Sequence, residues 1–506
     1  MKLEDIIPNT TPTVTSVESI LEAADVLERR GSTAVADVSV LTADSRAVTP
    51  GAVFVAVRGV SVDGHKFIGW AIDGGAAVVV LEEFPAELPE DVLFVRVADT
   101  RAALGRMASR YYGEPSDELR LVGVTGTNGK TTIATLLYDM ARMRGVKAGL
   151  ISTVAVKIDG EEYPSDHTTP DPILLNACLR RMADAGCEFA SMEVSSHAAD
   201  QHRIAGLNFA GGIFTNLTRD HLDYHKTFDA YLRAKKSFFD MLPSDAFALS
   251  NADDRNGAVM LQNTSARPRA FYSVRDAADF HVRVVEDRID GMLLDFGGRE
   301  VETMFTGSFN ASNLAAVYGA AILLGVSREE AGVLMSRLHP VAGRFQPFRS
   351  PKGVTAIVDY AHTPDALVNV LDTIREVLPD GASVITVCGC GGDRDPGKRP
   401  QMAKAAADRS DILVLTSDNP RSEDPNAILD DMLAGLDEYE KGKTHVYVDR
   451  REAIRAAVDM AEPGDIILLA GKGHETTQTL ATGTIHFDDR EEIQRAFSAD
   501  SESNNK

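Results

Sequence analysis

The chain is poor in cysteine, in long apolar runs and in positive charge, and each shortage excludes a class of protein. Its 506 residues include only four cysteines, which are too few and too scattered to staple a chain of this length, and they lack the paired spacing of a structural zinc site. No run approaches the roughly 18 to 20 apolar residues of a membrane span, and the N-terminus has no apolar signal core. We therefore expect a cytoplasmic protein with reduced thiols that does not enter a membrane.

The charge balance argues against a nucleic-acid or anionic-membrane partner. The formal net charge is -23, whereas polyanionic partners require a basic protein surface. Any phosphate group must therefore be bound by a local cluster of donors. No pattern indicates a stable partner protein, and we expect a monomer.

The sequence is rich in short apolar runs that alternate with longer helical patterns. This alternation is typical of a parallel sheet covered on both faces, and the length predicts about three domains. Polar or glycine-rich residues follow the apolar runs, and open α/β sheets bind ligands beyond the carboxyl ends of their strands. Glycine- and proline-containing stretches near 118 and 341 predict domains at 1–118, 119–341 and 342–506.

A glycine-rich stretch, "GVTGTNGKTT" at 123–132, lies between a predicted strand and a predicted helix. Gly126 and Gly129 allow backbone N–H groups to face phosphate oxygens, Lys130 supplies a point charge and Thr131 can ligate Mg²⁺. The strict Walker pattern would have glycine where this chain has Val124, and a Gly-Lys-Thr string also occurs in ordinary turns. Its position between strand and helix favours nucleotide binding.

Two downstream stretches carry candidate metal ligands. Glu193 ends an apolar run, where a carboxylate could reach Mg²⁺ or could simply be a solvated strand end. His221 and His225 lie close together before Lys235, which falls on a helical pattern. In isolation, these histidines are more typical of helix ends than of metal ligands.

Together and in order, a series of strings spanning nearly the whole chain resembles the Mur ligases. The strings are "GTNGKTT", "MEVSSHAADQHR", "TNLTRDHLDYH", "AKKSFF", "GSFNASN", "DYAHTPDAL", "GCGGDRDPGKRP", "DNPR" and "GKGHE". The resemblance implies an α/β protein with three-domain Mur ligase architecture, a central P-loop ATPase-type parallel sheet and a Rossmann-like C-terminal domain.

The implied activity is an ATP-dependent amide ligation in cytoplasmic peptidoglycan precursor synthesis. ATP phosphorylates the free carboxylate of UDP-N-acetylmuramoyl-L-alanyl-D-glutamate, and the amine of an incoming amino acid attacks the acyl phosphate. Activation is needed because a carboxylate is a poor electrophile, and phosphoryl transfer depends on positioning and charge neutralisation by Mg²⁺.

The resemblance also implies roles for the residues that handle ATP. The implied catalytic residues are Lys130, Glu193, His221 and Lys235. Lys130 would hold the terminal phosphates, and Lys235 aligns with a lysine that the family carbamylates, which would turn a cation into an anion. For Arg344, the alternative is a surface arginine beside a linker. The implied metal ligands are Thr131, Glu193, His221 and carbamylated Lys235. The implied ATP-binding residues are Gly126, Thr127, Asn128, Gly129, Lys130, Thr131, Thr132, Asn310, Arg344 and Asp359.

A further set is implied for the UDP-linked precursor, with Ser45 near the uridine end. Hydroxyls, an amide and an arginine suit an extended anionic sugar nucleotide, although each serine or threonine could instead serve a turn or a helix cap. The implied residues are Ser45, Thr168, Thr169, Ser195, Gln201 and Arg203.

The stretch "SDNPRSED", 417–424, bears on the identity of the incoming amino acid. In the family, Asp-Asn-Pro-Arg accompanies members that add meso-diaminopimelate, and the planar fork of Arg421 can grip a carboxylate through two parallel hydrogen bonds. The alternative is a surface ion pair with Glu423 or Asp424. The implied diaminopimelate-binding residues are Arg394, Asp418, Asn419, Arg421, Gly471 and Glu475.

Three other functions stay open at this point. They are a folylpolyglutamate-type ligase, a nucleotide-binding regulatory protein that has lost catalysis, and a ligase that adds lysine despite Arg421. Because the phosphate loop and Arg421 fall in different predicted domains, we also expect open and closed forms, with hinges near 118 and 341.

Overall fold

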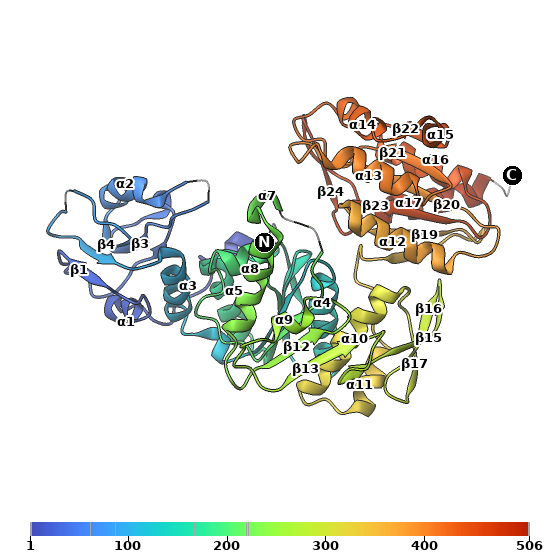
Figure 1. Cartoon of the computed structure of the whole chain (residues 1–506). Coiled ribbons are helices and arrows are strands. Elements are labelled where there is room, and N and C mark those ends of the chain that lie inside the picture. The colour runs from blue at the N-terminus through green and yellow to red at the C-terminus, as the bar shows by residue number, and fades with distance from the viewer. Residues whose placement is uncertain are drawn as a thin grey trace. The chain divides into compact units, whose positions relative to one another are not determined.

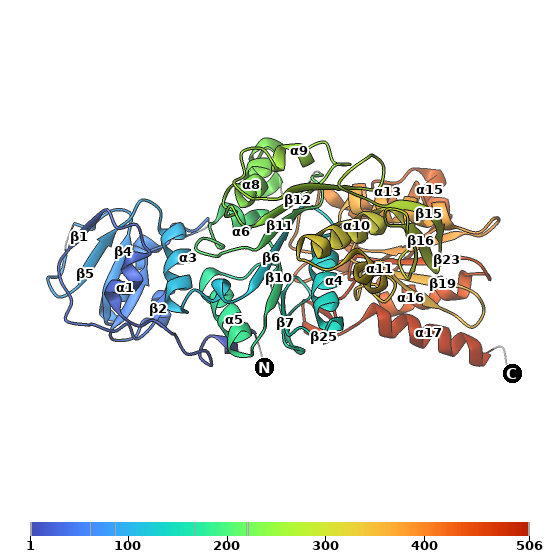
Figure 2. The same cartoon turned by 90° about the horizontal axis from the view of Figure 1, so that it is seen from below.

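The computed structural model describes residues 3–60, 62–86, 88–165, 167–218, 220 and 222–503, and Figures 1 and 2 draw it from two directions. The chain folds into two compact units. The first comprises Met1–Phe271 and Gly319–Gly325, and the second Tyr272–Tyr318 and Val326–Lys506. Within the described ranges, no helix combines the length and apolarity needed to cross a bilayer.

The first unit begins with a small mixed sheet in the order β1-β5-β4-β3-β2. Only β1 joins it antiparallel. Strand β4 reads as an unbroken apolar run because Val78 and Val80 belong to one hydrophobic core and Val79 and Leu81 to another. The strands are β1 (Glu28–Arg30), β2 (Leu41–Thr42), β3 (Ala52–Val55), β4 (Ala76–Leu81) and β5 (Leu93–Arg96), and the helices are η1 (Leu3–Ile6), α1 (Val17–Glu22), η2 (Ser45–Ala47), η3 (Gly64–Phe67), α2 (Ile68–Asp73), α3 (Thr100–Tyr111) and η4 (Pro115–Asp117).

The central sheet of this unit runs in the order β12-β11-β6-β10-β7-β8-β9, and Figure 2 shows β11, β6, β10 and β7 side by side. Its strands are parallel from β12 to β7 and antiparallel from there to β9. The strands are β6 (Arg120–Thr125), β7 (Ala148–Ile151), β8 (Ala155–Ile158), β9 (Glu161–Pro164), β10 (Phe189–Glu193), β11 (Gly211–Phe214) and β12 (Phe247–Asn251), and the helices are α4 (Lys130–Met143), α5 (Pro172–Asp184), α6 (Ser196–Asp200), α7 (Leu222–His225), α8 (Phe228–Asp240) and α9 (Gly257–Met260).

The small sheet and the central sheet share one hydrophobic core. Helix α3 packs against α5 and approaches the chain after α6 so closely that a Cβ at Gly105 would lie 2.8 Å from the Ala205 carbonyl oxygen. The Ser109 hydroxyl donates to the Gly206 carbonyl at 2.9 Å. The two sheets of the first unit are therefore packed together.

The second unit begins with a small antiparallel sheet and two helices. Strand β13 (Arg269–Ser273) spans the boundary between the units. Strand β14 (Phe280–His281) pairs parallel with β13. The small sheet consists of β15 (Arg283–Arg288), β16 (Gly291–Asp295) and β17 (Glu300–Thr303), and the helices are α10 (Ser308–Leu323) and α11 (Arg328–Met335).

The main sheet of the second unit runs in the order β18-β19-β23-β20-β21-β22. It is parallel except for the edge strand β18. Helices α12 to α14 contribute to the core on one face, and α16 and α17 to the core on the other. The elements are β18 (Gln346–Arg349), β19 (Thr355–Asp359), α12 (Pro364–Val377), β20 (Val384–Cys388), α13 (Lys398–Ala407), β21 (Ile412–Thr416), α14 (Pro425–Leu433), α15 (Glu438–Gly442), β22 (Thr444–Tyr447), α16 (Arg450–Met460), β23 (Ile466–Ala470), β24 (Thr477–Leu480), β25 (Gly483–His486) and α17 (Asp489–Ser503).

The last strand of this sheet in sequence, β23, lies between two earlier strands, β19 and β20. The loops that follow β19, β20, β21 and β23 consequently meet at one edge of the sheet (Figure 1). Such a reversal of strand order is where open α/β sheets bind ligands. The predicted α/β class, the central parallel sheet and the Rossmann-like C-terminal sheet are confirmed.

Candidate active site

The phosphate loop lies between β6 and α4, as predicted. Gly126 and Gly129 have positive φ angles of +150° and +86°, and a Cβ at Gly126 would come within 1.8 Å of the Thr215 hydroxyl oxygen. The Lys130 ammonium donates to the carbonyls of Gly126 and Thr127 at 3.0 and 2.8 Å. Glycine is required at 126, and Lys130 folds back over the loop whose N–H groups would face a phosphate.

The chain after β11 braces this loop. The Thr215 hydroxyl donates to the Asn128 carbonyl at 2.6 Å, and the Asn216 side-chain oxygen accepts from the Asn128 N–H at 2.9 Å. The Asn216 carbonyl accepts from the Thr127 N–H at 2.8 Å. In the sequence, the stretch after β11 draws attention only to its histidines, and nothing there indicates that Thr215 and Asn216 hold the phosphate loop in shape.

Helix α8 directs Lys235 into the same loop. The side chain is only 1% exposed, and its amine donates to the Gly126 carbonyl at 2.7 Å. Burial, and then the positive charge of Lys130, hold the pKa of Lys235 well below its usual value, against the smaller opposing effect of Asp220. The ring of Tyr231, 4.7 Å from the nitrogen, favours the cation, whereas full burial beside a second lysine favours the neutral amine.

Two of the predicted magnesium ligands, Thr131 and Glu193, lie at the carboxyl edge of the central sheet. Glu193 ends β10 opposite Val124 of β6, and its carboxylate accepts from the Thr153 N–H at 2.7 Å. Thr131 is the second residue of α4, while His221 lies outside the described residues. Among the described residues, here or elsewhere, no three His, Cys, Asp or Glu side chains gather into a metal-binding group. A hydroxyl and a carboxylate still suit Mg²⁺, which usually keeps several waters and takes few protein ligands beside substrate phosphates.

Beside Glu193, the fold gathers most of the residues predicted for the UDP-linked precursor. The Thr169 hydroxyl donates to the Glu193 carbonyl at 2.8 Å and accepts from the Ser195 N–H at 3.2 Å. The Arg203 guanidinium donates to the Thr169 carbonyl at 2.8 Å and to the Gln201 side-chain oxygen at 2.8 Å. These residues form one polar network at the edge of the phosphate-loop sheet.

Three details qualify that network. The Thr168 hydroxyl accepts from Thr153 at 3.0 Å, which places it at the edge of the network. Ser195 also caps α6 by accepting from the Ala198 N–H, so its cap role is real. Ser45 lies in the short helix η2, which follows β2 of the small sheet, and it is not part of the network.

In the second unit, the residues predicted for ATP lie around the end of β19. Asp359 ends that strand, and its carboxylate accepts from the Phe345 N–H at 2.7 Å. Burial raises the pKa of Asp359, with the nearby Arg344 opposing the shift. The Arg344 guanidinium lies 4.6 Å from the centre of the Tyr360 ring, which orients it by stacking.

Asn310 lies in the first turn of α10, next to these residues in the fold. Its amide donates to the Thr306 carbonyl at 2.9 Å and accepts from Asn313 at 3.3 Å. The neighbouring Phe309 packs edge-on against Phe345, with ring centres 5.4 Å apart. Asn310 is thus brought near the turn that carries Arg344.

The loop after β23 packs on the same turn. Gly343 has a φ of +65°, and a Cβ there would lie 2.1 Å from a backbone carbon of Gly473. The His474 ring lies 5.0 Å from that of Tyr360, and burial, followed by the charge of Arg344, lowers the pKa of His474 to about 3. Tyr360 and His474 were not predicted as site residues, although they belong to the strings "DYAHTPDAL" and "GKGHE".

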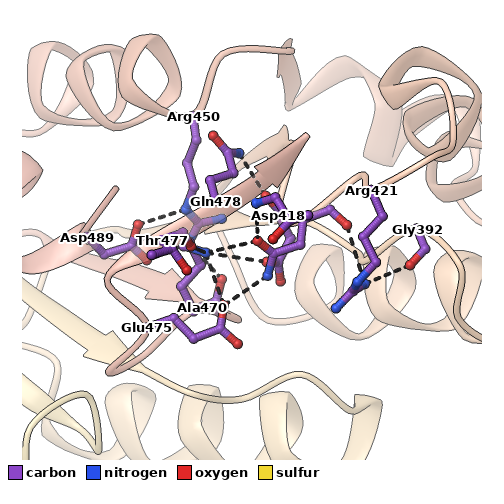
Figure 3. A network of polar contacts seen from close by, with 12 residues as sticks. Gly392, Asp418, Arg421, Arg450, Ala470, Glu475, Thr477, Gln478 and Asp489 are labelled. Carbon is purple, nitrogen blue, oxygen red and sulfur yellow. Dashed lines mark hydrogen bonds and ion pairs between the residues drawn. The ribbon is translucent and has the colours of Figure 1, made fainter. Parts of the chain in front are cut away.

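The loop after β21 presents Arg421 at the carboxyl edge of the sheet (Figure 3). Its guanidinium donates to the carbonyls of Gly392 and Asn419 at 2.7 and 3.4 Å. Its φ is +53°, which is uncommon for a residue with a side chain and is held by a hydrogen bond from its N–H to the Thr479 carbonyl at 3.0 Å. The backbone fixes this arginine in one orientation.

The alternative surface ion pair of Arg421 is not formed. Glu423 pairs with Arg399 at 2.8 Å, and Asp424 caps α14. Among the described residues, no carboxylate lies within 4 Å of the Arg421 guanidinium nitrogens. Its charge is therefore not neutralised by a directly paired carboxylate, and the nearest acid that feels it is Asp393.

Arg394 lies beside Arg421 although it is exposed. A Cβ at Gly391 would be 2.9 Å from a guanidinium nitrogen of Arg421 and 3.6 Å from Cγ of Arg394, so both side chains lie over that glycine. Arg394 donates to the Asp393 carbonyl at 3.3 Å. Two guanidinium groups on side chains this close together can bind two carboxylates of one ligand, which a single arginine could not do.

The remaining predicted residues of this region are also brought together. The Asn419 amide donates to Glu475 Oε2 at 2.9 Å, and a Cβ at Gly471 would lie 3.0 Å from Asp418 Oδ2. Burial raises the pKa of Asp418, with Lys472 the leading opposing charge. The arrangement combines paired guanidinium groups with a carboxylate acceptor, which suits a ligand that carries both carboxylates and an ammonium.

Comparisons with known proteins agree with the sequence. Family models match residues 37–112 as the Mur ligase family catalytic domain, 124–321 as the Mur ligase middle domain and 343–473 as the Mur ligase glutamate ligase domain. A UDP-N-acetylmuramoyl-L-alanyl-D-glutamate–2,6-diaminopimelate ligase from Bacteroides fragilis is 58% identical over 455 residues, which cover 90% of this chain and 94% of that relative. One of the same name from Phocaeicola vulgatus is 56% identical over 481 residues, covering 95% and 99% of the two chains.

A solved structure of a ligase with that name is 34% identical and covers 92% of this chain and 96% of its own, with a TM-score of 0.67. These similarities extend over all three matched regions and confirm the resemblance inferred from the ordered strings. The chain therefore belongs to the Mur ligase family.

Proposed function

We propose that the protein is an ATP-dependent ligase that adds meso-2,6-diaminopimelate to UDP-N-acetylmuramoyl-L-alanyl-D-glutamate through an acyl phosphate. The observation that carries the choice of amino acid is the Arg421 guanidinium, which is fixed by two carbonyls, lies beside Arg394 and has no carboxylate partner among the described residues. The names of the relatives support the same reaction. The domains are proposed at 1–118, 119–341 and 342–506.

ATP binds the loop from Gly126 to Thr132, with Asn310, Arg344 and Asp359 contacting the nucleotide. Lys130 offers its charge to the terminal phosphates, and its present carbonyl contacts are of the kind that a phosphate oxygen replaces. Thr131, Glu193 and His221 would hold Mg²⁺, which would supply positive charge to neutralise the transferring phosphoryl group.

Lys235 serves this centre as a carbamate. A neutral amine is the form that attacks carbon dioxide, forming an N–C bond and releasing one proton. The lowered pKa of the buried Lys235 increases the share of that form. The resulting carboxylate beside Lys130 relieves the repulsion between two lysines at one carbonyl and offers oxygen to the metal centre.

The precursor binds along the network formed by Thr168, Thr169, Ser195, Gln201 and Arg203, with Ser45 toward the uridine. This network is continuous with Glu193 through the Thr169 hydroxyl. A carboxylate oxygen of the precursor bonds to the γ-phosphorus, the bond from that phosphorus to the β–γ bridging oxygen breaks and ADP leaves. Phosphate can then leave the acyl carbon, which oxide could not do readily.

Diaminopimelate binds the third domain with its carboxylates on Arg394 and Arg421 and its distal ammonium on Glu475. Asp418, Asn419 and Gly471 shape the floor. The other amine, deprotonated, attacks the acyl-phosphate carbon. A C–N bond forms, the C–O bond to phosphate breaks and inorganic phosphate leaves.

Phosphate release tests this proposal directly. The purified protein is given ATP, Mg²⁺ and the UDP-linked dipeptide, with either meso-diaminopimelate or L-lysine, as the wild type and as R421A. Release with diaminopimelate alone is expected. Loss of the two charge-assisted hydrogen bonds, each worth roughly 1.5 to 3 kcal/mol, should raise the KM for diaminopimelate by two orders of magnitude or more in R421A.

Arg409→Ala is the matched control, because Arg409 is ion-paired with Asp372 and belongs to no predicted site. Equal release with lysine would refute the assignment of Arg421 and leave the ligase. Release that depends on a glutamate-terminated folate acceptor would favour the folylpolyglutamate-type alternative. No release with any acceptor would favour the regulatory alternative.

A further inference from the structure

Lys472 is a fully buried cation at the centre of the amino-acid pocket. It follows β23, between two glycines, and its side chain has 0% exposure. The ammonium donates to the Thr477 carbonyl at 2.6 Å and to Glu475 Oε2 at 3.1 Å, and it lies 3.5 Å from the Asn419 side-chain oxygen. It is also 3.9 Å from Asp418 Oδ1.

Burying a lysine this completely is expensive unless the charge is paired and its donors are satisfied. Three acceptors surround this ammonium, and two of the neighbouring groups are carboxylates. A residue with a purely packing role would not need such a set. The function proposed above uses Gly471 and Glu475 of the same string and leaves Lys472 unexplained.

The contacts of Glu475 show what the lysine does. Oε2 accepts from both Lys472 and Asn419, whereas no donor to Oε1 is found among the described residues. The carboxylate is half-buried, so one oxygen is tied to the protein and the other is left for a ligand. Figure 3 shows Glu475 at the end of this network, opposite Arg421.

The same ammonium reaches the backbone of Arg421 through two steps. Asn419, which accepts from Lys472, also accepts from the Thr479 N–H at 3.0 Å. The Thr479 carbonyl then accepts from the Arg421 N–H at 3.0 Å. Both ends of the pocket, the carboxylate and the guanidinium, are therefore anchored to one buried lysine.

We propose that Lys472 is a positioning residue for the amino-acid substrate, which holds Glu475 with one oxygen directed outward and fixes the Asn419-to-Arg421 segment relative to it. It touches no substrate. Its effect is on how well the pocket is preorganised for a ligand that carries an ammonium and a carboxylate at a fixed separation. This inference rests on the proposed function.

Lys472→Met tests it, because methionine has a similar length and fills the buried volume without the charge. Leaving Glu475 without its strongest partner should raise the KM for diaminopimelate by about tenfold to a hundredfold. The KM for ATP and for the UDP-linked dipeptide should stay unchanged. Lys443→Met is the matched control, since Lys443 also donates to two carbonyls of the same domain but lies outside the pocket.

A double-mutant cycle with Glu475→Gln separates positioning from general structure. If Lys472 acts through Glu475, K472M should add little to the diaminopimelate KM once E475Q is present. Additive effects, or equal rises in the KM of all three substrates, would overturn the inference. Should K472M not fold, Lys472→Gln, which keeps a neutral donor and adds no volume, is expected to show the same selective rise to a smaller degree.

The activity of the wild type distinguishes a failure of this inference from a failure of the proposed function. A wild type that ligates diaminopimelate while K472M behaves like K443M leaves the proposed function and refutes the role of Lys472. A wild type that does not accept diaminopimelate refutes both.

Discussion

Replacing Lys235 with methionine should remove a pH-dependent loss of stability in the first unit. The amine is 1% exposed and shares the Gly126 carbonyl with Lys130. Methionine has a similar length and carries no charge, so the substitution removes the titrating group while keeping most of the packing. The neighbouring Lys236, which is ion-paired with Asp240, provides the matched control K236M.

The direction of the pH dependence follows from the number of protons that the folded and the unfolded protein bind. Burial, and then the charge of Lys130, hold the pKa of Lys235 well below its usual value of 10.5 in the folded protein. Between the folded pKa and 10.5, the unfolded chain binds a proton that the folded protein does not. The free energy of unfolding therefore rises with pH in this window, and Lys235 contributes up to about 1.4 kcal/mol per pH unit to the slope.

The slope is a cleaner quantity than the stability at any one pH. K235M also loses the hydrogen bond to Gly126, which offsets part of the gain by about 1 kcal/mol at every pH. That constant term cancels when values at different pH are compared. The contribution to the slope is then the difference between the wild type and K235M.

Urea unfolding between pH 7 and pH 10 measures this difference, in buffers free of carbon dioxide so that the amine is not carbamylated. Far-UV circular dichroism follows the unfolding, because the single tryptophan, Trp70, is already exposed in the folded protein. We expect a flatter pH dependence for K235M than for the wild type and K236M. Equal slopes in all three proteins would show that Lys235 is charged in the folded state and would refute the reasoning.

Three further predictions concern the second unit. Gly343→Ala should destabilise it by more than Gly353→Ala, since both replace a glycine of positive φ, at about 1 to 2 kcal/mol, but only at Gly343 would the Cβ meet backbone, 2.1 Å away. Urea unfolding and the KM for ATP would measure this, and equal losses would contradict it. The pKa of His474 is about 3 in the folded protein, so the free energy of unfolding should fall as pH drops below the usual 6.5, by about 2 kcal/mol at pH 5. H474Q should lose that fall. If the wild type and H474Q lost the same free energy of unfolding between pH 7 and pH 5, the prediction would be wrong. Asp489→Asn should cost about 3 to 5 kcal/mol because it leaves the fully buried Arg450 without its carboxylate, and a loss below about 1 kcal/mol would show that the pair contributes little.

Much of the nucleotide side could be predicted because its chemistry is local in sequence. Positions 126 and 129 of the phosphate loop have positive φ angles, which favour glycine, and Lys130 follows Gly129 directly. Glu193 was placed at a strand end from an apolar run alone. A short motif between a strand and a helix specifies its own geometry, and so the pattern was sufficient.

The partners of these residues could not be predicted in the same way. Nothing in the residues around Lys235 indicates that its amine shares a carbonyl with Lys130, more than a hundred positions earlier. Likewise, the stacking of Arg344 on Tyr360 joins a turn before β18 to the end of β19. Each of these contacts depends on which strands are neighbours, and periodicity does not determine strand order.

Strand order also explains why Lys472 was missed while Gly471 and Glu475 were found. The apolar run of β23 predicts a buried parallel strand, but only its insertion between β19 and β20 brings the following loop against Asn419. At an edge strand, the same lysine would be solvated and of little consequence. Its burial among Asp418, Asn419 and Glu475 makes its charge part of the pocket, because removing it would leave two carboxylates in a poorly solvated site without their nearest common cation.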